Sequence, residues 1–529
     1  MHDQFLEDGV QDALLGNLLR RFNVADALHR SALRYPSRPA VTFEGEMISY
    51  QMLDEWANQV AHWLQNQGIH GGDVIATLSL NHPRLAALWM GAARIGAVYC
   101  PINPMLSPRD IAATVHQVQA RALFADDALS AAADQMGPSE TMRVSLESHH
   151  SGWLNWDQTV AQSATDYVEA VVTSDAVSTL LFTSGTESAP KGVMNTHANW
   201  YATLLSMFAD LDMDRRQKVM LALPLFHVAG LYILLGTLSS GAEGYLMRRI
   251  VPGELLQAID QHQLTWVSLP ATVFIGLLSQ PNLSSASLQS LKRCVVFQYI
   301  PTTPLNEWKA RLPQVDWSTY WGQSELTPLG ASMPPEEFWT RTGEADPIGL
   351  AHLPVELRLV DSGDHEVLPG QPGEIVVRSP AVMSGYFKDP LRTAETFRNG
   401  WHHTGDIAYK DPDGFVHFVD RKKGIIKCGG ENVSSQKVEE AIASVPGVAE
   451  VAVFGVPDPY WIEAVVAAVV LGRNANVSAD SIKEACKSRL ARFEVPKAIY
   501  FVDALPKNPA GKILKRDLIN LFDTGDVDR

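Results

Sequence analysis

The sequence predicts an α/β protein with a large N-terminal domain of several subdomains, one of them rich in β-strands, and a small α+β C-terminal domain. Apolar runs at 74–79 and 177–182 alternate with helical stretches at 50–67 and 84–95, the order expected of buried strands covered by helices. From 355 to 378 the pattern changes to short strands separated by turns. With 529 residues and 46% hydrophobic content, the chain can fill several cores.

The second domain is expected to begin after the turn-rich KDPDG at 410–414 and the charged segment 420–423. Its order of elements is typical of an α+β unit. The expected elements are a helix at 435–444, strands at 450–454 and 465–471, a helix at 479–490 and a late strand. We therefore divide the chain into an N-terminal domain, 1–419, a connection, 420–423, and a C-terminal domain, 424–529.

Charge and cysteine usage exclude several classes of function. The net charge of −16 gives no general attraction for nucleic acid or anionic lipid, so an anionic ligand must be held by local cations and backbone amides. The four cysteines form no C-x-x-C pair, which disfavours a disulfide framework and a structural zinc site. The acidic N-terminus lacks the pattern of a signal peptide. These features favour a cytoplasmic protein.

One apolar stretch, 219–238, is long enough to cross a membrane. Pro224, His227 and Gly230 lie inside it. A strand that ends at Pro224, followed by a loop and a buried helix, explains the same residues without placing a histidine in lipid. We therefore predict no transmembrane segment.

The strongest local pattern is LLFTSGTESAPKG at 180–192, an apolar strand that leads into hydroxyls, small residues and one lysine. Backbone amides and hydroxyls in such a loop can donate to phosphate oxygens, and Lys191 offsets their charge. The candidate phosphate-binding residues before the lysine are Thr183, Ser184, Gly185 and Thr186. The loop lacks the G-x-x-x-x-G-K-[ST] pattern of a P-loop NTPase. A serine- and threonine-rich surface loop remains the alternative for this segment alone.

TSGTESAPKG resembles the phosphate-binding loop of the AMP-forming adenylating superfamily, which includes acyl-CoA synthetases, nonribosomal-peptide adenylation domains and beetle luciferases. Further motifs that resemble the family follow in the family's order. They are WGQSE at 321–325, WHHTGD at 401–406, DR at 420–421 with IIKCGGENV at 425–433, and LPKNPAGKILK at 505–515. The similarity extends from about residue 23 to residue 517.

The resemblance implies roles for residues near the phosphates and the reacting carboxylate. Glu325 would bind Mg²⁺ with Thr186, because a carboxylate beside ATP needs a hard cation to bridge it to phosphate oxygens. Ser324 would offer its hydroxyl to the α-phosphate. Lys512 would contact both the carboxylate and the α-phosphate during adenylation, where its charge stabilises the transition state.

The nucleoside would be held by two other motifs. By resemblance, Trp321 with Gly322 would contact adenine. Asp406 would accept hydrogen bonds from the ribose hydroxyls, and Arg421 would donate to the ribose. Alone, a buried aromatic residue, an aspartate in a turn or an arginine in a surface ion pair would carry little weight.

The resemblance also implies two half-reactions separated by rotation of the small domain. The carboxylate attacks the α-phosphate and expels pyrophosphate, and a thiolate then attacks the acyl carbon and expels AMP. Lys423 corresponds to the hinge residue, so 420–423 is the expected hinge and 424–529 the mobile domain. Lys427, Gly429 and Gly430 would lie on the loop that replaces Lys512 at the site.

The acid pocket is expected to involve His227, which gates it in the family, although a lone histidine in an apolar stretch is more often a hydrogen-bonded core residue. Gln298 and Tyr299 stand where relatives have a Gly-Gly-Ala-Pro type of segment. Their bulk and hydrogen-bonding groups favour a small or polar-substituted acid over a long chain. Glu187-Ser188 in the phosphate loop and Tyr460-Trp461 near the expected CoA route also depart from the family pattern.

We therefore predict an acyl-CoA synthetase that uses ATP, Mg²⁺ and coenzyme A and acts on a small-molecule carboxylic acid. A ligase that loads the phosphopantetheine of a separate carrier protein is the main alternative, and GGENVS at 429–434 favours CoA. A luciferase-like oxygenase and a non-catalytic nucleotide- or acyl-binding protein are further alternatives. The oligomeric state, monomer or homodimer, is left open.

Overall fold

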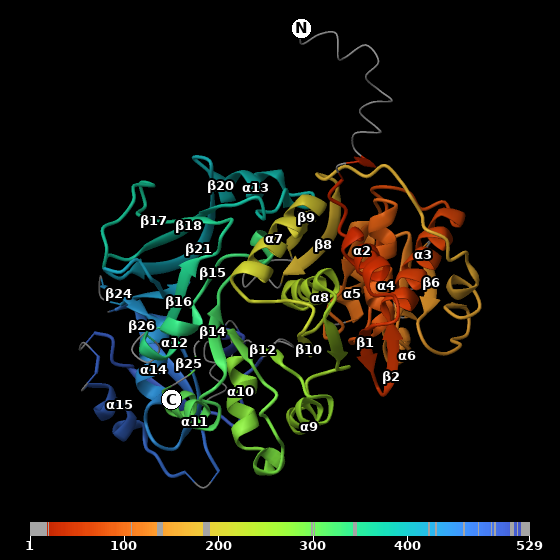
Figure 1. The fold of residues 1–529 in the computed structure, drawn as a ribbon. Coiled ribbons are helices and arrows are strands. Elements are labelled where there is room, and N and C mark those ends of the chain that lie inside the picture. The colour runs from red at the N-terminus through yellow and green to blue at the C-terminus, as the bar shows by residue number, and fades with distance from the viewer. Residues whose placement is uncertain are drawn as a thin grey trace.

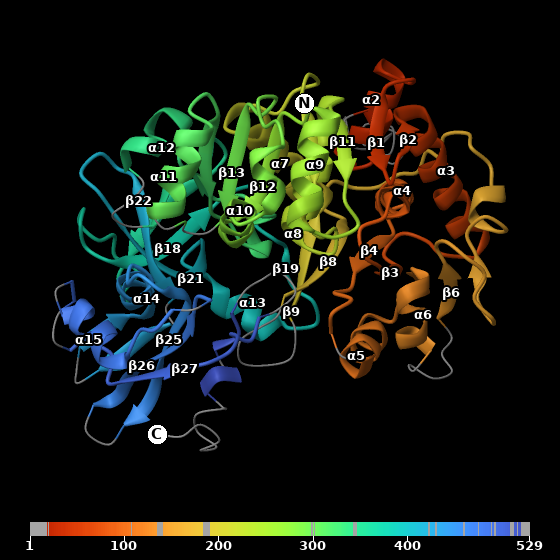
Figure 2. The ribbon, with the colours of Figure 1, turned by 90° about the horizontal axis from the view of Figure 1, so that it is seen from below.

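Two sheets rich in parallel strands lie side by side in the N-terminal part of the chain (Figures 1 and 2). The computed structural model describes residues 18–19, 21–106, 108–134, 141–183, 191–297, 300, 302–341, 346–421, 424–428, 431–458, 461–473, 475–487, 489–490, 493–507, 513–515 and 517–519. The first sheet runs in spatial order through β19 (Gly385–Tyr386), β9 (Lys191–Thr196), β8 (Val177–Thr183), β4 (Val98–Pro101), β3 (Val74–Leu78), β5 (Ala122–Ala125), β6 (Met142–Ser145) and β7 (Leu154–Asn155). All its neighbours are parallel except β9 with β8 and β19 with β9.

The second sheet is parallel except for the pairing of its last two strands. It runs through β14 (Asp316–Tyr320), β13 (Arg293–Phe297), β12 (Trp266–Pro270), β10 (Lys218–Leu221), β11 (Glu243–Leu246), β1 (Pro39–Phe43) and β2 (Glu46–Ser49). These two sheets confirm the predicted α/β class, because buried runs of β-branched and other apolar residues form parallel strands between helices.

Helices separate and cover the two sheets. One core joins facing sides of both sheets through α2 (Asp26–Arg34), α3 (Tyr50–Asn66), α4 (Pro83–Arg94), α7 (His197–Ala209) and α8 (Val228–Ser240). The outer side of the first sheet packs near α5 (Pro108–Val118) and α6 (Asp127–Asp134). The outer side of the second packs on α9 (Pro252–His262), α10 (Ala271–Leu278), α11 (Thr302–Arg311) and α12 (Pro335–Arg341).

The apolar stretch 219–238 forms β10, a loop and the buried helix α8, as the sequence predicts. The strand ends at Leu221, three residues earlier than expected. The loop is compact, because a Cβ at Gly230 would lie 2.2 Å from the carbonyl oxygen of Pro224. Within the described ranges, no helix is long and apolar enough to span a bilayer.

An antiparallel sheet forms the predicted β-rich subdomain, and it extends beyond the segment 355–378 on both sides. It runs through β15 (Ala331–Ser332), β16 (Asp346–Ala351), β22 (Val416–Arg421), β21 (Trp401–Lys410), β18 (Gly373–Arg378) and β17 (Glu356–Val360), and β20 (Phe397–Arg398) pairs with β21. The short helix α13 (Pro390–Thr396) connects β19 to β20.

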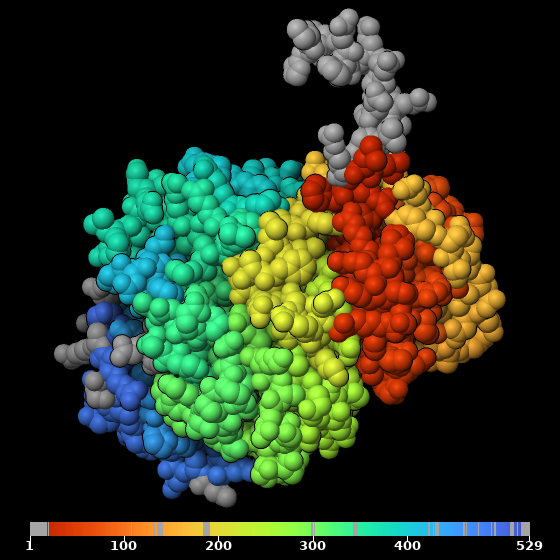
Figure 3. Space-filling model, viewed as in Figure 1, coloured from red at the N-terminus to blue at the C-terminus, as the bar shows by residue number. Residues whose placement is uncertain are grey.

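The C-terminal residues, blue in Figure 3, gather at one side of the molecule. Their sheet runs through β24 (Glu431–Ser434), β23 (Ile425–Cys428), β26 (Ile462–Leu471) and β25 (Val448–Asp458), with β27 (Ala498–Phe501) paired to β26. The helices α14 (Ser435–Ala443) and α15 (Ala479–Lys487) belong to the same unit, and one core joins them to strands of the sheet. This α+β order matches the expectation, although β25 and β26 are longer than predicted.

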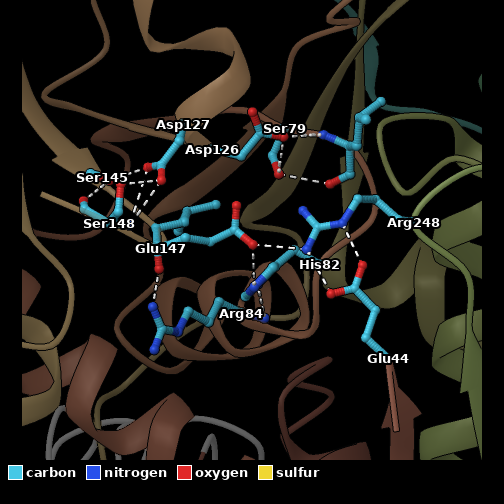
Figure 4. Close-up of polar contacts among 12 residues, drawn as sticks. Glu44, Ser79, His82, Arg84, Asp126, Asp127, Ser145, Glu147, Ser148 and Arg248 are labelled. Carbon is cyan, nitrogen blue, oxygen red and sulfur yellow. Dashed lines mark hydrogen bonds and ion pairs between the residues drawn. The ribbon is translucent and has the colours of Figure 1, made fainter. Parts of the chain in front are cut away.

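A polar network joins the carboxyl ends of strands from the two large sheets (Figure 4). Arg248, which follows β11, pairs with Glu44 after β1 at 2.7 Å and with Glu147 after β6 at 2.8 Å. His82 lies 3.7 Å from Glu147. These contacts cross from one sheet to the other and help to fix their relative positions.

Candidate active site

The phosphate-binding motif lies between two antiparallel strands. Thr183 ends β8 and stands opposite Lys191, the first residue of β9. The Nζ atom of Lys191 lies 5.3 Å from the ring centroid of Tyr386. The predicted phosphate ligands Ser184, Gly185 and Thr186 lie outside the described residues. The hairpin thus places Lys191 beside a tyrosine that the sequence analysis did not single out.

Tyr386 also holds the candidate metal ligand. Its hydroxyl donates a hydrogen bond to Oε1 of Glu325 at 2.9 Å, and the amide of Met383 donates to the backbone oxygen of Glu325 at 2.8 Å. Burial and the Glu325 carboxylate raise the pKa of Tyr386, so the phenol stays protonated as a donor. β19 places Tyr386 there by pairing it with Val193 of β9. Glu325 is therefore oriented by the strand that lies next to the phosphate hairpin.

A buried amide fixes the turn that presents Ser324 and Glu325. This turn is a short 3₁₀ helix, η4 (Ser324–Leu326). Asn195 of β9 donates through Nδ2 to the carbonyl of Ser324 at 3.0 Å and to Oγ1 of Thr327 at 2.8 Å. Thr327, in the left-handed region at φ 59°, donates in turn to the carbonyl of Ala381. Asn195 was missed by the sequence analysis, since a buried asparagine in a strand has no pattern of its own.

The two predicted ribose-binding residues meet across a pair of antiparallel strands. Asp406 of β21 is opposite Arg421 of β22, and Arg421 Nε lies 3.5 Å from Asp406 Oδ1. The indole of Trp321 donates to Asp406 Oδ2 at 3.0 Å, and the amide of Gln323 donates to the same atom at 2.9 Å. The side chain of Asp406 is 4% exposed and that of Arg421 is 53% exposed. The carboxylate is thus held from inside and the guanidinium lies at the surface.

Two residues of the WGQSE motif have a clear structural function. Trp321 is buried in the core of the antiparallel sheet and orients Asp406, a function in addition to the predicted contact with adenine. A Cβ at Gly322 would lie 1.5 Å from the carbonyl oxygen of Pro328, so this turn requires glycine. Motifs about eighty residues apart in the chain, at 321–325 and 401–406, are therefore joined by direct hydrogen bonds.

The turn before Asp406 is anchored by Glu374 of β18, a second residue that the sequence analysis missed. Glu374 accepts a hydrogen bond from the amide of Gly405 at 3.1 Å and lies 3.4 Å from His403 Nδ1. Thr404 donates to the carbonyl of Ile375 at 2.7 Å. Gly405 has φ +72°, which glycine adopts without strain. A glutamate in a strand has no local pattern that marks this contact, so the sequence alone offered no signal for it.

His227 is exposed rather than a core residue. It is the N-cap of α8, and its Nδ1 accepts a hydrogen bond from the amide of Ala229 at 3.2 Å. This contact explains the residue type structurally, and its role as a gate for the acid stays a prediction. Gln298 and Tyr299, the other candidate pocket residues, lie outside the described residues.

The predicted residues of the C-terminal motifs lie mostly outside the described residues. Lys427 is on β23, and only its backbone is described. The motif residues outside the described ranges are Lys423, Gly429, Gly430 and Lys512. Their proposed functions therefore depend on the sequence motifs.

The described residues fit a magnesium ion bound together with ATP. No group of three or more potential ligands among histidine, cysteine, aspartate and glutamate occurs in the described part of the chain. Mg²⁺ commonly uses one or two carboxylates and takes its other ligands from phosphates and water. The Glu325 carboxylate suits that arrangement, because it is oriented by Tyr386, whose ring lies beside the lysine of the phosphate hairpin.

Comparisons with known proteins identify the family of this chain. Residues 28–387 match the family described as AMP-binding enzyme, and residues 437–512 match the AMP-binding enzyme C-terminal domain. A feruloyl-CoA synthase of an Amycolatopsis species is 31% identical over 498 residues, which cover 93% of this chain and 98% of the relative. A fatty acid–[acyl-carrier-protein] ligase of Streptomyces coeruleorubidus is 29% identical over 493 residues, with coverage of 92% and 94%.

The fold agrees with a solved structure over nearly its whole length. The crystal structure of ATP-bound MatB from Rhodopseudomonas palustris has a TM-score of 0.87 and 25% identity, and covers 95% of this chain and 99% of its own. The fold class, with a large N-terminal α/β part and a smaller C-terminal part, is confirmed. Since the family match spans more than half of the sequence and continues into the C-terminal part, the chain belongs to the AMP-binding enzyme family.

Proposed function

We propose that this enzyme is an acyl-CoA synthetase, an acid–thiol ligase that forms AMP. It activates a carboxylic acid with ATP as an acyl-adenylate, releases pyrophosphate, and transfers the acyl group to the thiol of coenzyme A. The observation that carries this proposal is that the segment 321–325 joins two groups of residues: Glu325 accepts from Tyr386 beside Lys191, and Trp321 and Gln323 donate to Asp406 opposite Arg421. Separate cationic, acidic and ribose-binding groups are what an ATP-dependent adenylation needs.

In the first half-reaction, the chain's task is to hold ATP and stabilise charge. Lys191 offsets the charge of the phosphates, and Ser324 donates to the α-phosphate. Asp406 accepts from the ribose hydroxyls while Arg421 donates to the ribose. Trp321, with Gly322, contacts adenine.

Glu325, together with Thr186, holds Mg²⁺ in this proposal. When bound, Mg²⁺ neutralises charge on the phosphates and favours departure of pyrophosphate. Tyr386 keeps the Glu325 carboxylate oriented before the metal and nucleotide arrive. This preorganisation reduces the rearrangement that binding requires.

The second half-reaction is proposed to follow rotation of residues 424–529 about 420–423. Asp420 supports this position for the hinge, because its carboxylate accepts hydrogen bonds of 2.8 Å from both the amide and the hydroxyl of Ser435 in the C-terminal unit. A Cβ at Gly424 would lie 2.2 Å from the same carboxylate. Rotation would withdraw Lys512 and bring the loop with Lys427, Gly429 and Gly430 to the site.

The first test measures pyrophosphate release from ATP and Mg²⁺ with short, medium, long-chain and aromatic acids, each with and without coenzyme A. Multiple turnovers that depend on one acid and on CoA are expected. About one equivalent of pyrophosphate, unaffected by CoA, would indicate a carrier-protein acceptor, the activity named for the Streptomyces relative. No release with any acid would contradict the ligase and favour a nucleotide-binding protein.

A second test separates the two half-reactions. Lys512→Ala is expected to slow adenylation about 10²–10³-fold, the loss typical of one preorganised charge-stabilising donor. Thiolysis of a supplied acyl-adenylate should be largely retained, because that step uses the other face of the small domain. Equal loss of both steps would contradict the rotation.

A further inference from the structure

The carboxyl edge of the second large sheet carries a group of buried polar side chains. Phe297 ends β13 and Tyr320 ends β14, and the two residues are paired in register. Tyr320 directly precedes Trp321 of the nucleotide motif. Ligands of parallel sheets bind outside the carboxyl ends of the strands, so the side chains around Tyr320 are well placed to contact the acid.

Four side chains from separate segments form what we name the polar cluster: Ser206 of α7, Tyr232 of α8, Tyr320 of β14 and His352. The ring centroid of Tyr320 lies 5.6 Å from that of Tyr232 and 4.9 Å from that of His352. Ser206 lies beside Tyr232, and the hydroxyl of Ser206 influences the pKa of Tyr232. All four residues are at most 6% exposed.

None of the four has its hydrogen-bonding capacity fully used within the described residues. The hydroxyls of Ser206, Tyr232 and Tyr320 and the Nε2 atom of His352 are buried without a partner there. The hydroxyl of Tyr232 lies near enough to those of Tyr320 and Ser206 for each to influence its pKa, but none of these pairs meets the full geometry of a hydrogen bond. Each buried unpaired group costs about 1–3 kcal/mol, so several in one place indicate a position where a bound molecule can supply the missing partners.

The same face of the sheet continues this polar character. Ser268 of β12 and Ser318 of β14 are in register with Val295 between them, and Ser318 precedes Tyr320 by two residues. Side chains two apart on a strand share a face, and the hydroxyls of Ser268 and Ser318 are also buried without a described partner. A site for a purely aliphatic chain would not need these hydroxyls.

The hydrogen-bonding character of the polar cluster restricts what it can bind. His352 Nδ1 accepts from the amide of Gly330 at 3.2 Å, so Nε2 carries the proton of the neutral ring and donates. Burial lowers the pKa of His352 to about 4 and raises the pKa values of Tyr232 and Tyr320, so all three are neutral at pH 7. The charged group that influences His352 and Tyr320 is the carboxylate of Asp210, which disfavours a second anion.

We infer that the polar cluster binds a neutral hydrogen-bonding substituent, a hydroxyl or carbonyl, at the end of the acid remote from its reacting carboxylate. This inference rests on the proposed function, since it assigns the substrate class of that site. The preferred substrate is then a short or aromatic acid with a polar distal group. A long-chain fatty acid would leave the cluster unpaired, and a dicarboxylic acid would face the carboxylate of Asp210.

The test uses two matched series of acids: hexanoic, 6-hydroxyhexanoic and hexanedioic acid, and cinnamic, 4-hydroxycinnamic and 4-carboxycinnamic acid. The kcat/KM for pyrophosphate release is measured for each, and binding of each acid in the presence of AMP is measured by calorimetry. In at least one series, the hydroxy acid is expected to exceed the other two by about tenfold or more, because a site built to hydrogen-bond a substituent rejects analogues that lack it.

Tyr320→Phe and Tyr232→Phe should reduce the ratio of hydroxy acid to unsubstituted acid, in kcat/KM and in affinity, about tenfold each, since each removes a hydrogen bond to the substrate. Tyr99→Phe is the matched control. Tyr99 is equally buried, but it lies on β4 of the other sheet, where its hydroxyl accepts a hydrogen bond from Thr77. Its removal should leave the ratio unchanged.

The outcomes separate the inference from the proposed ligase activity. Pyrophosphate release that favours the unsubstituted or dicarboxylic acids in both series overturns the inference and leaves the ligase standing. Phenylalanine variants that are more stable but have unaltered ratios also overturn it, because the hydroxyls would then be buried without a role in binding. If no acid supports pyrophosphate release, the proposed function fails, and calorimetric binding without a preference for the hydroxy acids overturns the inference independently.

Discussion

Tyr386 contacts two residues that have different proposed roles. Its ring faces Lys191 of the phosphate hairpin, and its hydroxyl donates to the Glu325 carboxylate. A single side chain therefore links the residue proposed to offset phosphate charge to the residue proposed to bind the metal. Phenylalanine keeps the first contact and removes the second, which makes the two functions separable.

Tyr386→Phe is expected to raise the Mg²⁺ concentration for half-maximal pyrophosphate release about tenfold or more, since a hydrogen bond to a charged group is worth about 1.5–3 kcal/mol. Tyr386→Leu, which also removes the ring beside Lys191, should raise the KM for ATP as well. The measurement is initial rate against Mg²⁺ at several ATP concentrations. Identical effects of the two variants would show that the hydroxyl has no separate role.

At the scale of elements, the start of α7 connects the phosphate hairpin to the segment that carries Tyr386. Thr196 and Asn199 form a capping box, with Thr196 Oγ1 accepting from the amide of Asn199 and Asn199 Oδ1 accepting from the amide of Thr196. Asn199 also donates to the carbonyls of Pro380 and Val382 at 2.8 and 2.9 Å. The helix cap thus positions the chain just before Met383.

Thr196→Ala should lower the free energy of unfolding by about 1 kcal/mol, the usual effect of losing an N-cap side chain. Asn199→Ala should cost more and should also slow pyrophosphate release, because it frees the segment that orients Glu325. Urea unfolding and initial rates measure the two effects. Equal activity of both variants would show that the cap contributes stability only.

Elements with a strong periodic pattern could be predicted closely from the sequence. The helices expected at 50–67 and 84–95 are α3 and α4 within one residue at each end, and the strand at 177–182 is one residue longer. β19 could not be predicted, because a two-residue strand has no periodicity and forms only when β9 offers it an edge. Tyr386 and Asn195 were missed for the same reason: tertiary contacts, not local patterns, give them their functions.

The family resemblance assigned Asp406 and Arg421 to the ribose separately, and their position opposite each other on β21 and β22 appears only in the structure. The sequence could not show that Trp321 and Gln323 both donate to Asp406. An indole and an amide can each donate to many acceptors, and the sequence does not indicate which acceptor lies near them. Supporting residues depend on geometry that only the folded chain supplies.

For the whole molecule, buried histidines from separate elements predict sensitivity to acid. Burial lowers the pKa of His82 to about 3 and those of His197, His352 and His402 to about 4. The unfolded chain therefore binds more protons than the folded chain once the pH falls below about 6.5. Stability present at neutral pH is lost progressively between about pH 6.5 and 3.

The urea concentration at the midpoint of unfolding should accordingly decrease as the pH is lowered from 7.5 to 5.5. His197→Gln should weaken this pH dependence, because it removes one group whose pKa differs between the states, with each pKa unit worth about 1.4 kcal/mol. His365→Gln, at a side chain that is 82% exposed, is the control and should preserve it. An unchanged midpoint across this range in the unmodified chain would contradict the prediction.

In the proposed arrangement, the two large sheets divide the substrates between them. The phosphate hairpin and Tyr386 belong to the first sheet, whereas the polar cluster surrounds Tyr320 at the carboxyl end of β14 in the second. If the polar cluster binds the acid, substitutions there would change the acid preference and leave Lys191, Tyr386 and Glu325 unchanged. Acceptance of new acids would then arise first through substitutions at Tyr232, Tyr320 and His352. These three positions are therefore the first to randomise in directed evolution of acid preference.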